Sequence, residues 1–355
     1  MKTPVIKVHP QYPELDKIAH CAKIVRKGGL VIFPTETVYG IAADYNNPQA
    51  IERLRHIKHR DASKPFSVLI SQKGLVSNYT SVIDPAVYKL VDEYWPGPLT
   101  VIVPTKDGHG SIGIRMPLNI VSLHLVQECQ CTVAAPSANI AGRPPPVTCE
   151  DALRDLDGQV DVAIDGGPAK IGSSSSVVDL TGDKPKLLRE GVITQKDVDE
   201  VVRKKHILFI CTGNSCRSVM AEYLLKCLLK GRNDVAVVSA GTGVFLRSSA
   251  SSETLAVLKR RDIDASDHQS QPLNTILLKK SDLILVMTKM HRQQVLERVP
   301  DVEKRVYLLR EFSDDPVSNT DTNMDIPDPI GKTPQAYEDC MVTIQEAVHK
   351  LVKLL

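Results

Sequence analysis

The pattern of apolar and polar positions divides the chain into two halves that are organised differently. Up to about residue 200, short apolar runs that predict buried strands are mixed with stretches of helical periodicity. The expected strands are residues 30–33, 66–70, 99–103, 132–135, 175–180 and 186–188, and the expected helices are residues 15–27, 49–58, 85–93 and 120–129. Because these elements do not alternate regularly, the first half predicts an α/β domain built on a mixed, twisted sheet.

In the second half, strands and helices alternate regularly. The expected strands are residues 207–210, 235–239, 283–287 and 305–309, and the expected helices are residues 219–230, 252–261 and 291–298. A last helix begins at Thr333-Pro334, a hydroxyl cap followed by proline in the first helical position. This alternation predicts a four-stranded parallel sheet flanked by helices. The polar, charged segment 195–205 marks the boundary, so we expect domains at residues 1–200 and 204–355.

Composition argues against several classes of protein. The chain has 355 residues, 42% of them apolar, which exceeds one ordinary domain and allows packed cores. The net charge is +2 and only 4% of residues are aromatic, which argues against a basic, base-stacking surface for nucleic acid. The eight cysteines lack a Cys-x-x-Cys spacing, and no metal site or disulfide framework is expected. Because neither a membrane-length apolar run nor a signal-peptide pattern is present, we expect a cytoplasmic protein without membrane attachment.

The strongest motif follows the first strand of the second half. That strand ends in Cys211, and Arg217 and Ser218 open the next helix. The residues between are Thr212, Gly213, Asn214, Ser215 and Cys216. A loop of this size at a helix N-terminus can wrap its backbone N–H groups around one anion, and Arg217 can add a two-pronged donor to phosphate oxygens. The same positive field favours a nucleophilic thiolate at Cys211.

Other side chains of this loop have supporting roles in the prediction. Ser218 can donate a hydrogen bond to the thiolate, and Asn214 can hold the loop in shape. Cys216 either traps Cys211 in a reversible disulfide or only packs the loop. A buried cysteine beside an ordinary turn is the simpler alternative for Cys211. The order of strand, Gly, Asn, Arg, Ser and helix favours the phosphate loop.

Cleavage of a phosphate ester also needs a general acid for the leaving group. Asp328 is the candidate, because it lies between two prolines in a loop before the last helix. In a parallel sheet this loop and the cysteine loop can share the carboxyl edge. Asp325 is the competing candidate, and a structural role in a turn is the alternative for either aspartate.

The first half carries polar motifs of its own. Residues 35–37 carry hydroxyls and a carboxylate directly after a predicted strand. Such side chains are better suited to binding a small polar ligand than to packing in a hydrophobic core. Lys58, Arg60 and Lys64 run from a helix end into a loop and suit a polyphosphate, although a solvated helix end is the alternative. No Walker-type loop and no dinucleotide-binding glycine pattern is present. From the residues alone, the first half is an anion-binding α/β domain.

Residues 206–355 resemble the low-molecular-weight protein-tyrosine-phosphatase family over nearly its whole length. The matching pieces are the loop at residues 211–218, Ser239-Ala240-Gly241, residues 281–288 and Asp328-Pro329. The resemblance implies that family's fold, with Cys211 as nucleophile, Arg217 as phosphate binder and Asp328 as acid and then base. It also implies a phosphoprotein substrate and no cofactor.

Three departures bear on the substrate. Val219 stands where the family usually has proline, and Thr212 and Ile330 stand where tyrosine-specific members carry an aliphatic residue and tyrosine. Bacterial protein-arginine-phosphatase relatives carry threonine directly after the nucleophile, where this chain has Thr212. A threonine hydroxyl can form a hydrogen bond with a guanidinium. Phosphotyrosine and phosphoarginine therefore both stay open as substrates. A related arsenate reductase is disfavoured, because no cysteine for a disulfide relay lies between Cys227 and Cys340.

Residues 10–195 resemble the YrdC-like threonylcarbamoyl-AMP synthase family. The matching motifs are residues 34–40, Lys58-x-Arg60, residues 95–100, Arg115-x-Pro117 and Ser137-x-Asn139. The resemblance implies conversion of ATP, L-threonine and bicarbonate to threonylcarbamoyl-AMP and pyrophosphate, for modification of the adenosine beside the tRNA anticodon. It implies threonine binding by Thr35 and Arg115. It implies ATP binding, with Mg²⁺ brought by the phosphates, by Lys58, Arg60, Ser111, Ser137, Asn139, Ser176 and Arg189.

Departures from this family are small. Phe66 stands where leucine is usual and Ser111 where threonine is commoner. Longer relatives carry their own C-terminal domain where this chain has the phosphatase-like half.

Three hypotheses for the function of the whole chain follow. The chain is two active enzymes, or an active phosphatase fused to a nucleotide- or RNA-binding module, or a tRNA-modification subunit whose second half serves for docking. The intact motifs in both halves favour the first, with tRNA or tRNA-modification proteins as partners.

Overall fold

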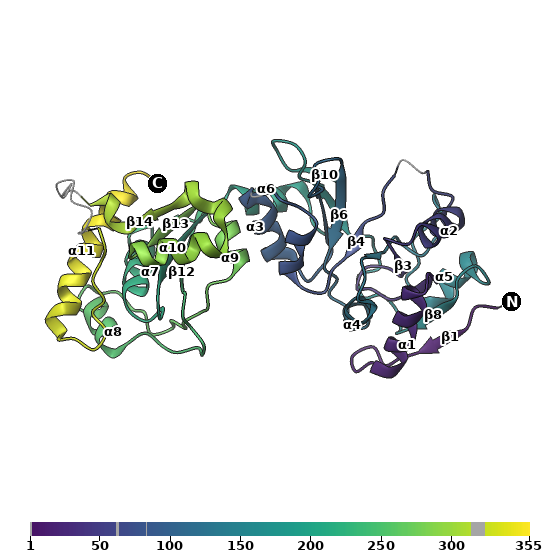
Figure 1. The fold of residues 1–355 in the computed structure, drawn as a ribbon, viewed down its shortest axis with the longest axis horizontal. Helices are drawn as coiled ribbons and strands as arrows, with labels where there is room; N and C mark the ends of the chain where they lie inside the picture. The colour runs from purple at the N-terminus through teal and green to yellow at the C-terminus, as the bar shows by residue number, and fades with distance from the viewer. Residues whose placement is uncertain (1, 62–63, 83, 314–323) are drawn as a thin grey trace. The chain divides into compact units, whose positions relative to one another are not determined.

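The chain folds into two units, each with its own sheet (Figure 1). The computed structural model describes residues 2–61, 64–82, 84–313 and 324–355. One unit consists of Met1–Val82 and Lys89–Val201, and the other of Ile83–Tyr88 and Val202–Leu355.

In the described part of the first unit, ten strands form one mixed sheet in the order β1-β8-β2-β3-β7-β4-β6-β5-β9-β10. Their bounds are β1 Val5–Lys7, β2 Val31–Phe33, β3 Gly40–Asp44, β4 Val68–Leu69, β5 Leu99–Pro104, β6 Ser111–Arg115, β7 Val133–Ala134, β8 Val162–Asp165, β9 Ser176–Asp179 and β10 Lys186–Arg189. Parallel pairs such as β1 with β8 occur beside antiparallel pairs such as β2 with β3. The prediction of a mixed sheet is therefore confirmed.

Four strands of this sheet were not expected from the apolar pattern: β1, β3, β6 and β8. Strand β3 reads Gly-Ile-Ala-Ala-Asp, and its small residues have little intrinsic preference for strands. It forms because it pairs with β2, where Phe33 lies opposite Gly40. This hairpin places residues 34–39 at the end of two buried strands, which is where the polar motif of the first half lies.

In the first unit, contacts between neighbouring residues explain where helices begin and end. Those wholly within this unit are α1 Leu15–Arg26, α2 Pro48–Lys58, α4 Ile120–Cys129 and α5 Cys149–Leu156, with a 3₁₀ helix η1 at Lys73–Asn78. Helices α3 Pro85–Tyr94 and α6 Gln195–Arg203 each contain residues of both units. In α2, the Asn47 side chain accepts a hydrogen bond from the backbone N–H of Ala50, and Pro48 occupies the first turn. His59 ends the helix in the left-handed conformation, with φ of 48°. The end of α2 therefore brings Lys58 and Arg60 close to each other.

The second unit has a four-stranded sheet in its described residues, in the order β12-β11-β13-β14, with every neighbouring pair parallel. The strands are β11 Lys205–Cys211, β12 Val235–Gly241, β13 Leu283–Val286 and β14 Val306–Leu308. The helices are α7 Arg217–Leu228, α8 Ser252–Lys259, α9 Thr275–Lys280, α10 Lys289–Arg298 and α11 Pro334–Val352, with 3₁₀ helices η2 Pro300–Arg305 and η3 Leu309–Phe312. The predicted parallel sheet flanked by helices is confirmed.

Two hydrophobic cores cover the two faces of this sheet. Along β11, Ile207, Phe209 and Cys211 belong to the core that α7, α8 and α11 complete. Leu208 and Ile210 point the other way, into the core shared with α9 and α10. This alternation is the period of two that a strand imposes. It puts Cys211 on the same face as α7, the helix that its loop leads into.

The segment at the expected boundary has regular structure rather than that of a loop. Residues 195–203 form α6, with Val198 buried, and β11 begins two residues later at Lys205. The polar composition that marked this segment belongs to the exposed face of a short amphipathic helix.

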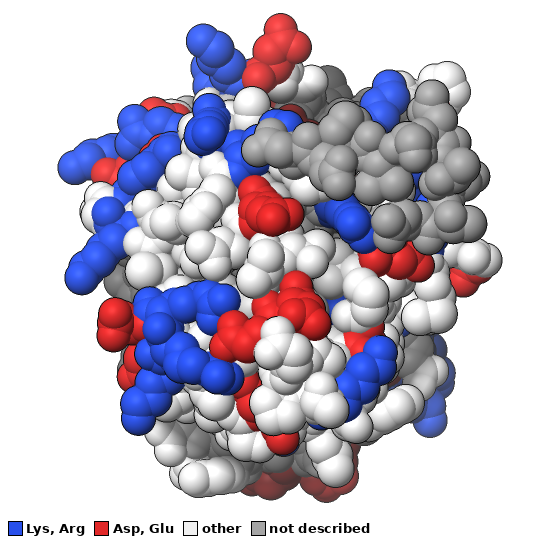
Figure 2. All heavy atoms as spheres, turned by 90° about the vertical axis from the view of Figure 1, so that its left-hand side faces the viewer, with Lys and Arg blue, Asp and Glu red and all other residues white. Residues whose placement is uncertain are grey.

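Charge on the surface is mixed in sign. Figure 2 shows one face of the second unit, where lysine and arginine side chains are interspersed with aspartate and glutamate. Among the helices in the described part of the chain, none is long and apolar enough to cross a lipid bilayer.

Candidate active sites

The loop between β11 and α7 closes around the Cys211 thiol. Cys211 ends β11, lies opposite Gly241 of β12 and is 3% exposed. Its sulfur lies 3.0 Å from the Ser218 hydroxyl oxygen and accepts a hydrogen bond from the backbone N–H of Asn214 at 3.3 Å. Polar groups are therefore aimed at this sulfur, which distinguishes it from a cysteine that only fills a core.

Asn214 holds the loop in its bent shape. It is fully buried and adopts a left-handed conformation with φ of 52°. Its side-chain amide donates to the hydroxyls of Ser218, at 3.0 Å, and Ser239, at 2.6 Å, and its side-chain carbonyl accepts from the backbone N–H of Gln271 at 2.9 Å. The His268 ring lies 2.8 Å from the Asn214 backbone carbonyl. A left-handed asparagine is tolerated here because its side chain is satisfied on both ends.

Arg217 and Asp328 lie together although 111 residues separate them in sequence. Arg217 opens α7, is 4% exposed and donates to the backbone carbonyl of Ile326 at 3.0 Å. Its other terminal nitrogen forms an ion pair with the Asp328 carboxylate. The Arg217 Nε has no hydrogen-bond acceptor among the residues that the structure describes. The Asp328 side chain is 40% exposed, so the pair reaches the surface of the site.

Asp325 has a different position from Asp328. Its carboxylate accepts a hydrogen bond from the backbone N–H of Lys289 at 2.7 Å, at the start of α10. A carboxylate at a helix N-terminus is a stabilising arrangement. Of the two aspartates that the sequence offers as the acid, Asp328 is the one paired with Arg217.

Thr212 contacts a histidine that the sequence analysis did not single out. The Thr212 hydroxyl lies 2.9 Å from Nε2 of His291, and Nδ1 of the same ring lies 2.8 Å from the Thr288 hydroxyl. His291 is fully buried. Burial, together with the positive charge of Arg217, lowers the pKa of His291 from 6.5 to about 4, against the opposing effects of Asp328 and Asp325. Nothing in the sequence marks this residue, because Thr212 lies 79 residues away in the chain.

Gly241 makes room for the cysteine loop. A Cβ atom at this position would lie 2.4 Å from the backbone oxygen of Thr212 and 3.0 Å from the backbone nitrogen of Asn214. Real side chains do not approach this closely, so a larger residue at 241 would displace the loop. By contrast, a Cβ at Gly243 would lie 3.5 Å from the Thr212 methyl group, an ordinary contact.

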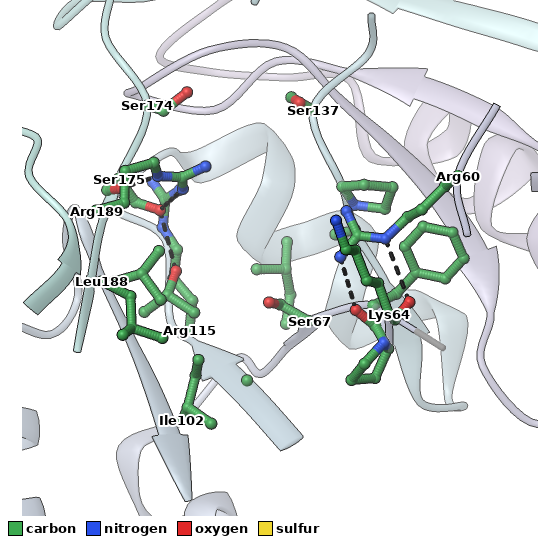
Figure 3. A pocket seen from close by; sticks show the side chains of 18 of the residues that line it. Arg60, Lys64, Ser67, Ile102, Arg115, Ser137, Ser174, Ser175, Leu188 and Arg189 are labelled. Carbon is green, nitrogen blue, oxygen red and sulfur yellow. Dashed lines mark hydrogen bonds between the residues drawn. The ribbon is translucent and has the colours of Figure 1, made fainter. Parts of the chain in front are cut away.

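The first unit contains a cavity of about 470 Å³ whose lining combines positively charged and hydroxyl side chains with apolar ones and with Asp179 (Figure 3). The predicted site residues that line it are Lys58, Arg60, Ser111, Arg115, Ser137 and Arg189. Lys64, which the sequence analysis grouped with Lys58 and Arg60, also lines it. Further lining residues that the sequence analysis did not assign to the site include Ser67, Thr100, Ser174 and Ser175. Figure 3 shows Arg60 with Lys64 on one side of the cavity and Arg189 with Ser175 on the other.

The cations around this cavity are held by neutral acceptors. The Lys58 ammonium donates to the backbone carbonyls of Ser137, at 2.5 Å, and Asn139, at 2.7 Å. Arg189 donates to the carbonyl and hydroxyl of Ser175, at 2.9 and 3.0 Å. Burial lowers the pKa of Arg189, and the nearby charges of Arg115 and Arg60 add to this effect. Positively charged side chains that are held by neutral oxygens, as Lys58 and Arg189 are, suit an anion site.

Arg115 is the exception, because its guanidinium pairs with Glu36. The Arg115 Nη2 donates to Glu36 Oε1 at 2.6 Å, and both side chains are at least nine-tenths buried. The second carboxylate oxygen of Glu36 is buried without a hydrogen-bond partner in the described chain. Thr35 organises the same segment: its hydroxyl donates to the carbonyl of Val38 at 2.6 Å and accepts from the N–H groups of Thr37 and Val38. Neither Thr35 nor Glu36 lines the cavity directly.

Two of the residues predicted to surround the nucleotide, Ser176 and Asn139, do not line the cavity. The Ser176 side chain is fully buried and does not face the cavity, because its hydroxyl donates to the carbonyl of Ile193 at 2.8 Å and accepts from two backbone N–H groups. Its neighbour Ser175 lines the cavity instead. Neighbouring side chains along an extended chain point to opposite sides, so Ser175 and Ser176 face different ways. Asn139 accepts from the Ser137 hydroxyl at 2.6 Å and does not itself line the cavity.

Among the described residues, no group of three or more His, Cys, Asp or Glu side chains is arranged to hold a metal ion.

Two family models match the chain. One, described as "Telomere recombination" and covering Sua5, YciO and YrdC proteins, matches residues 23–191. The other, described as "Low molecular weight phosphotyrosine protein phosphatase", matches residues 206–355.

Individual relatives match one half or the other. A threonylcarbamoyl-AMP synthase of Bacillus subtilis is 36% identical over 200 residues, which cover 54% of this chain and 58% of that protein. A Ralstonia solanacearum protein named "Probable low molecular weight protein-tyrosine-phosphatase EpsP" is 36% identical over 144 residues, covering 41% of this chain and 91% of that protein. The chain spans 58% of the Bacillus synthase and 66% of a Pyrococcus abyssi synthase that is 34% identical, less than two thirds of either.

A solved structure shows a related fold. The crystal structure of P. abyssi Sua5 complexed with L-threonine superposes with a TM-score of 0.54 at 24% identity, covering 86% of this chain and 99% of that chain. At this identity the likeness concerns the fold alone.

Proposed function

Because the chain belongs to the Sua5, YciO and YrdC family in residues 23–191 and to the low-molecular-weight phosphotyrosine phosphatase family in residues 206–355, we propose that it carries two enzymatic activities. The first unit would make threonylcarbamoyl-AMP and pyrophosphate from ATP, L-threonine and bicarbonate, for threonylcarbamoyladenosine modification of tRNA. The second would hydrolyse phosphoproteins through a cysteinyl-phosphate. We propose a boundary between the two domains at residues 200–204.

The cation-lined cavity is the observation that carries the synthase proposal. Lys58, Arg60 and Arg189 converge on it, and only neutral oxygens hold Lys58 and Arg189. An ATP triphosphate, with Mg²⁺ bound to its phosphates, supplies the negative charge that these side chains lack. Arg115 would pair with the threonine carboxylate, and Thr35 would keep the neighbouring segment in shape. Ser111, Ser137 and Ser175 offer hydroxyls to the nucleotide.

Pyrophosphate release from ATP, with threonine and bicarbonate present, tests this proposal. Lys58→Ala should weaken ATP binding and Arg115→Ala should mainly raise the threonine requirement. Losing a charge-assisted contact should cost roughly 1.5–3 kcal/mol, or about 10- to 150-fold. Wild-type rates and substrate requirements in both variants would refute the assignment.

The convergence of Cys211, Arg217 and Asp328 carries the phosphatase proposal. The thiolate of Cys211 would attack phosphorus while the loop N–H groups and Arg217 hold the phosphate oxygens. Asp328 would protonate the leaving group and then, as a carboxylate, take a proton from the water that hydrolyses the cysteinyl-phosphate. Before substrate arrives, Asp328 is paired with Arg217. An incoming phosphate would compete for Arg217, and Asp328, released from the ion pair, would take up a proton from solvent before it donates that proton to the leaving group.

Hydrolysis of a chromogenic aryl phosphate tests the second activity. Cys211→Ser should abolish turnover yet retain affinity for inorganic phosphate, because the loop amides and Arg217 remain. Asp328→Asn should slow hydrolysis of phosphotyrosine by about 100-fold or more, the usual scale for a lost general acid. The activated aryl phosphate, whose leaving group needs less help, should lose less. Turnover that survives Cys211→Ser would eliminate the cysteinyl-phosphate.

Thr212 tests which phosphorylated side chain is the substrate. If its hydroxyl accepts from a guanidinium, Thr212→Ile should depress phosphoarginine hydrolysis and spare phosphotyrosine hydrolysis. The apolar side chain would leave a buried guanidinium N–H unpaired, at about 1–3 kcal/mol. Equal effects on both substrates would leave a phosphatase without preference for phosphoarginine.

A further inference from the structure

His291 links the cysteine loop to the start of α10 through two hydroxyls. Its Nε2 lies 2.9 Å from Thr212 Oγ1, and its Nδ1 lies 2.8 Å from Thr288 Oγ1. The ring is fully buried, and the cleavage chemistry proposed for Cys211 and Asp328 does not use it. His291 is therefore a buried titratable side chain that touches the cysteine loop and takes no part in the proposed cleavage.

The ring is neutral near pH 7, which limits the hydrogen bonds that it can make. Burial and the charge of Arg217 lower the pKa of His291 to about 4, while Asp328 and Asp325 oppose this effect. A neutral imidazole has one donor nitrogen and one acceptor nitrogen. The position of its single proton therefore decides whether Thr212 donates to the ring or accepts from it.

Two arrangements of protons satisfy the chain of contacts. In the first, Nδ1–H donates to the Thr288 hydroxyl oxygen and Nε2 accepts from the Thr212 hydroxyl. Both lone pairs of Thr212 are then free to accept hydrogen bonds from a ligand. In the second, the Thr288 hydroxyl donates to Nδ1, and Nε2–H donates to Thr212. Thr212 then turns its own proton toward the ligand. The backbone N–H of His291 donates to Thr288 Oγ1 at 3.2 Å in either case.

We propose that His291 is a positioning residue that accepts the Thr212 hydroxyl proton and so presents Thr212 as a pure acceptor to the leaving group of the substrate. The proposal rests on the proposed phosphatase function and identifies the substrate class as guanidino phosphates. A guanidinium has only N–H donors, so it needs an acceptor at this place. The phenyl ring of phosphotyrosine has no N–H group and gains nothing from it.

The ratio of kcat/KM for phosphoarginine to kcat/KM for phosphotyrosine, measured on the full chain, tests the proposal. His291→Leu removes the acceptor, and this ratio should fall about tenfold or more, the scale for an unpaired buried donor. His291→Gln should restore much of the ratio, because its side-chain carbonyl can accept from Thr212. In a Thr212→Val background, His291→Leu should not lower the ratio further, since the two changes remove one interaction. An unchanged ratio in His291→Leu, or additive losses in the double variant, would overturn the proposal.

A second measurement decides the question if His291→Leu does not fold. Nitrogen NMR of the wild-type chain, labelled at histidine, reports which ring nitrogen of His291 carries the proton. We expect the proton on Nδ1, and a proton on Nε2 would refute the donor and acceptor assignment.

Wild-type activities separate this proposal from the one it rests on. Wild-type protein that hydrolyses neither substrate would remove the phosphatase function. Protein that hydrolyses phosphotyrosine and aryl phosphates but not phosphoarginine would keep that function and overturn the role of His291.

Discussion

Lys58 illustrates how burial changes a single charged residue. Its ammonium is 4% exposed and donates to two backbone carbonyls rather than to a carboxylate. Burial, with a smaller contribution from the nearby charge of Arg60, lowers its pKa from 10.5 to about 8. A bound anion would therefore stabilise the charged form of Lys58, which has no carboxylate partner within hydrogen-bond distance among the described residues.

This shift predicts a pH dependence of ATP binding. Above pH 8 the free protein loses the Lys58 charge, whereas a bound triphosphate favours the ammonium and raises its pKa again. ATP binding at pH 8.5 should therefore take up protons, and affinity should fall as pH rises from about 8 toward 10. Calorimetry in two buffers of different ionisation enthalpy measures the uptake.

Lys58→Arg serves as the control for this measurement, because a guanidinium stays charged over the whole range. The variant should bind ATP without proton uptake. The same uptake in wild type and Lys58→Arg would assign the titration to another group.

At the scale of elements, the second unit shows how a strand, a loop and a helix form one functional piece. Strand β11 ends in Cys211, and α7 begins with Arg217. The loop between them is held from β12 by Ser239 and bounded by Gly241, where a Cβ would meet the Thr212 backbone oxygen at 2.4 Å. The pairing of β11 with β12 thus fixes the geometry of the loop.

Gly241→Ala should therefore damage the phosphatase activity more than the fold. The added methyl group must push the loop away from Cys211, and a displacement of this kind can cost about 100-fold in rate. Aryl phosphate kcat/KM reports the loss, and the thermal unfolding midpoint reports the fold.

Gly243→Ala is the matched control, because its Cβ would make only an ordinary 3.5 Å contact with Thr212. It should change kcat/KM far less. Comparable losses in the two variants would show that the space at residue 241 is not what shapes the loop.

At the scale of the whole molecule, two separate sheets suggest two separate chemistries. The cavity residues of the first unit and the cysteine loop of the second belong to different compact units. Substitutions in one site should then leave the other activity intact.

Cross-assays of site variants test this independence. Cys211→Ser should abolish aryl phosphate hydrolysis and leave pyrophosphate release within about twofold of wild type, and Lys58→Ala should do the reverse, as expected for distant, independent sites. Loss of both activities in either variant, while both sheets stay folded by circular dichroism, would demonstrate coupling between the units.

The sequence alone was most informative in the second half. The regular alternation of apolar strands and helices predicts the four-stranded parallel sheet, and the loop from Cys211 to Ser218 is contiguous in sequence. Local order is enough there, because a strand, a tight loop and a helix dipole are all built from neighbouring residues. The end of α2 was predictable for the same reason, and it delivers both Lys58 and Arg60.

Other features were decided only by tertiary structure. Strand β3 forms from small residues because it pairs with β2, and Ser175 rather than Ser176 faces the cavity because neighbouring side chains alternate. His291 lies against Thr212, and Asp328 rather than Asp325 pairs with Arg217, through contacts between segments far apart in the chain. Sequence patterns record local geometry and periodic burial. They do not record which distant polar groups meet, because that depends on how the strands order themselves in the sheet.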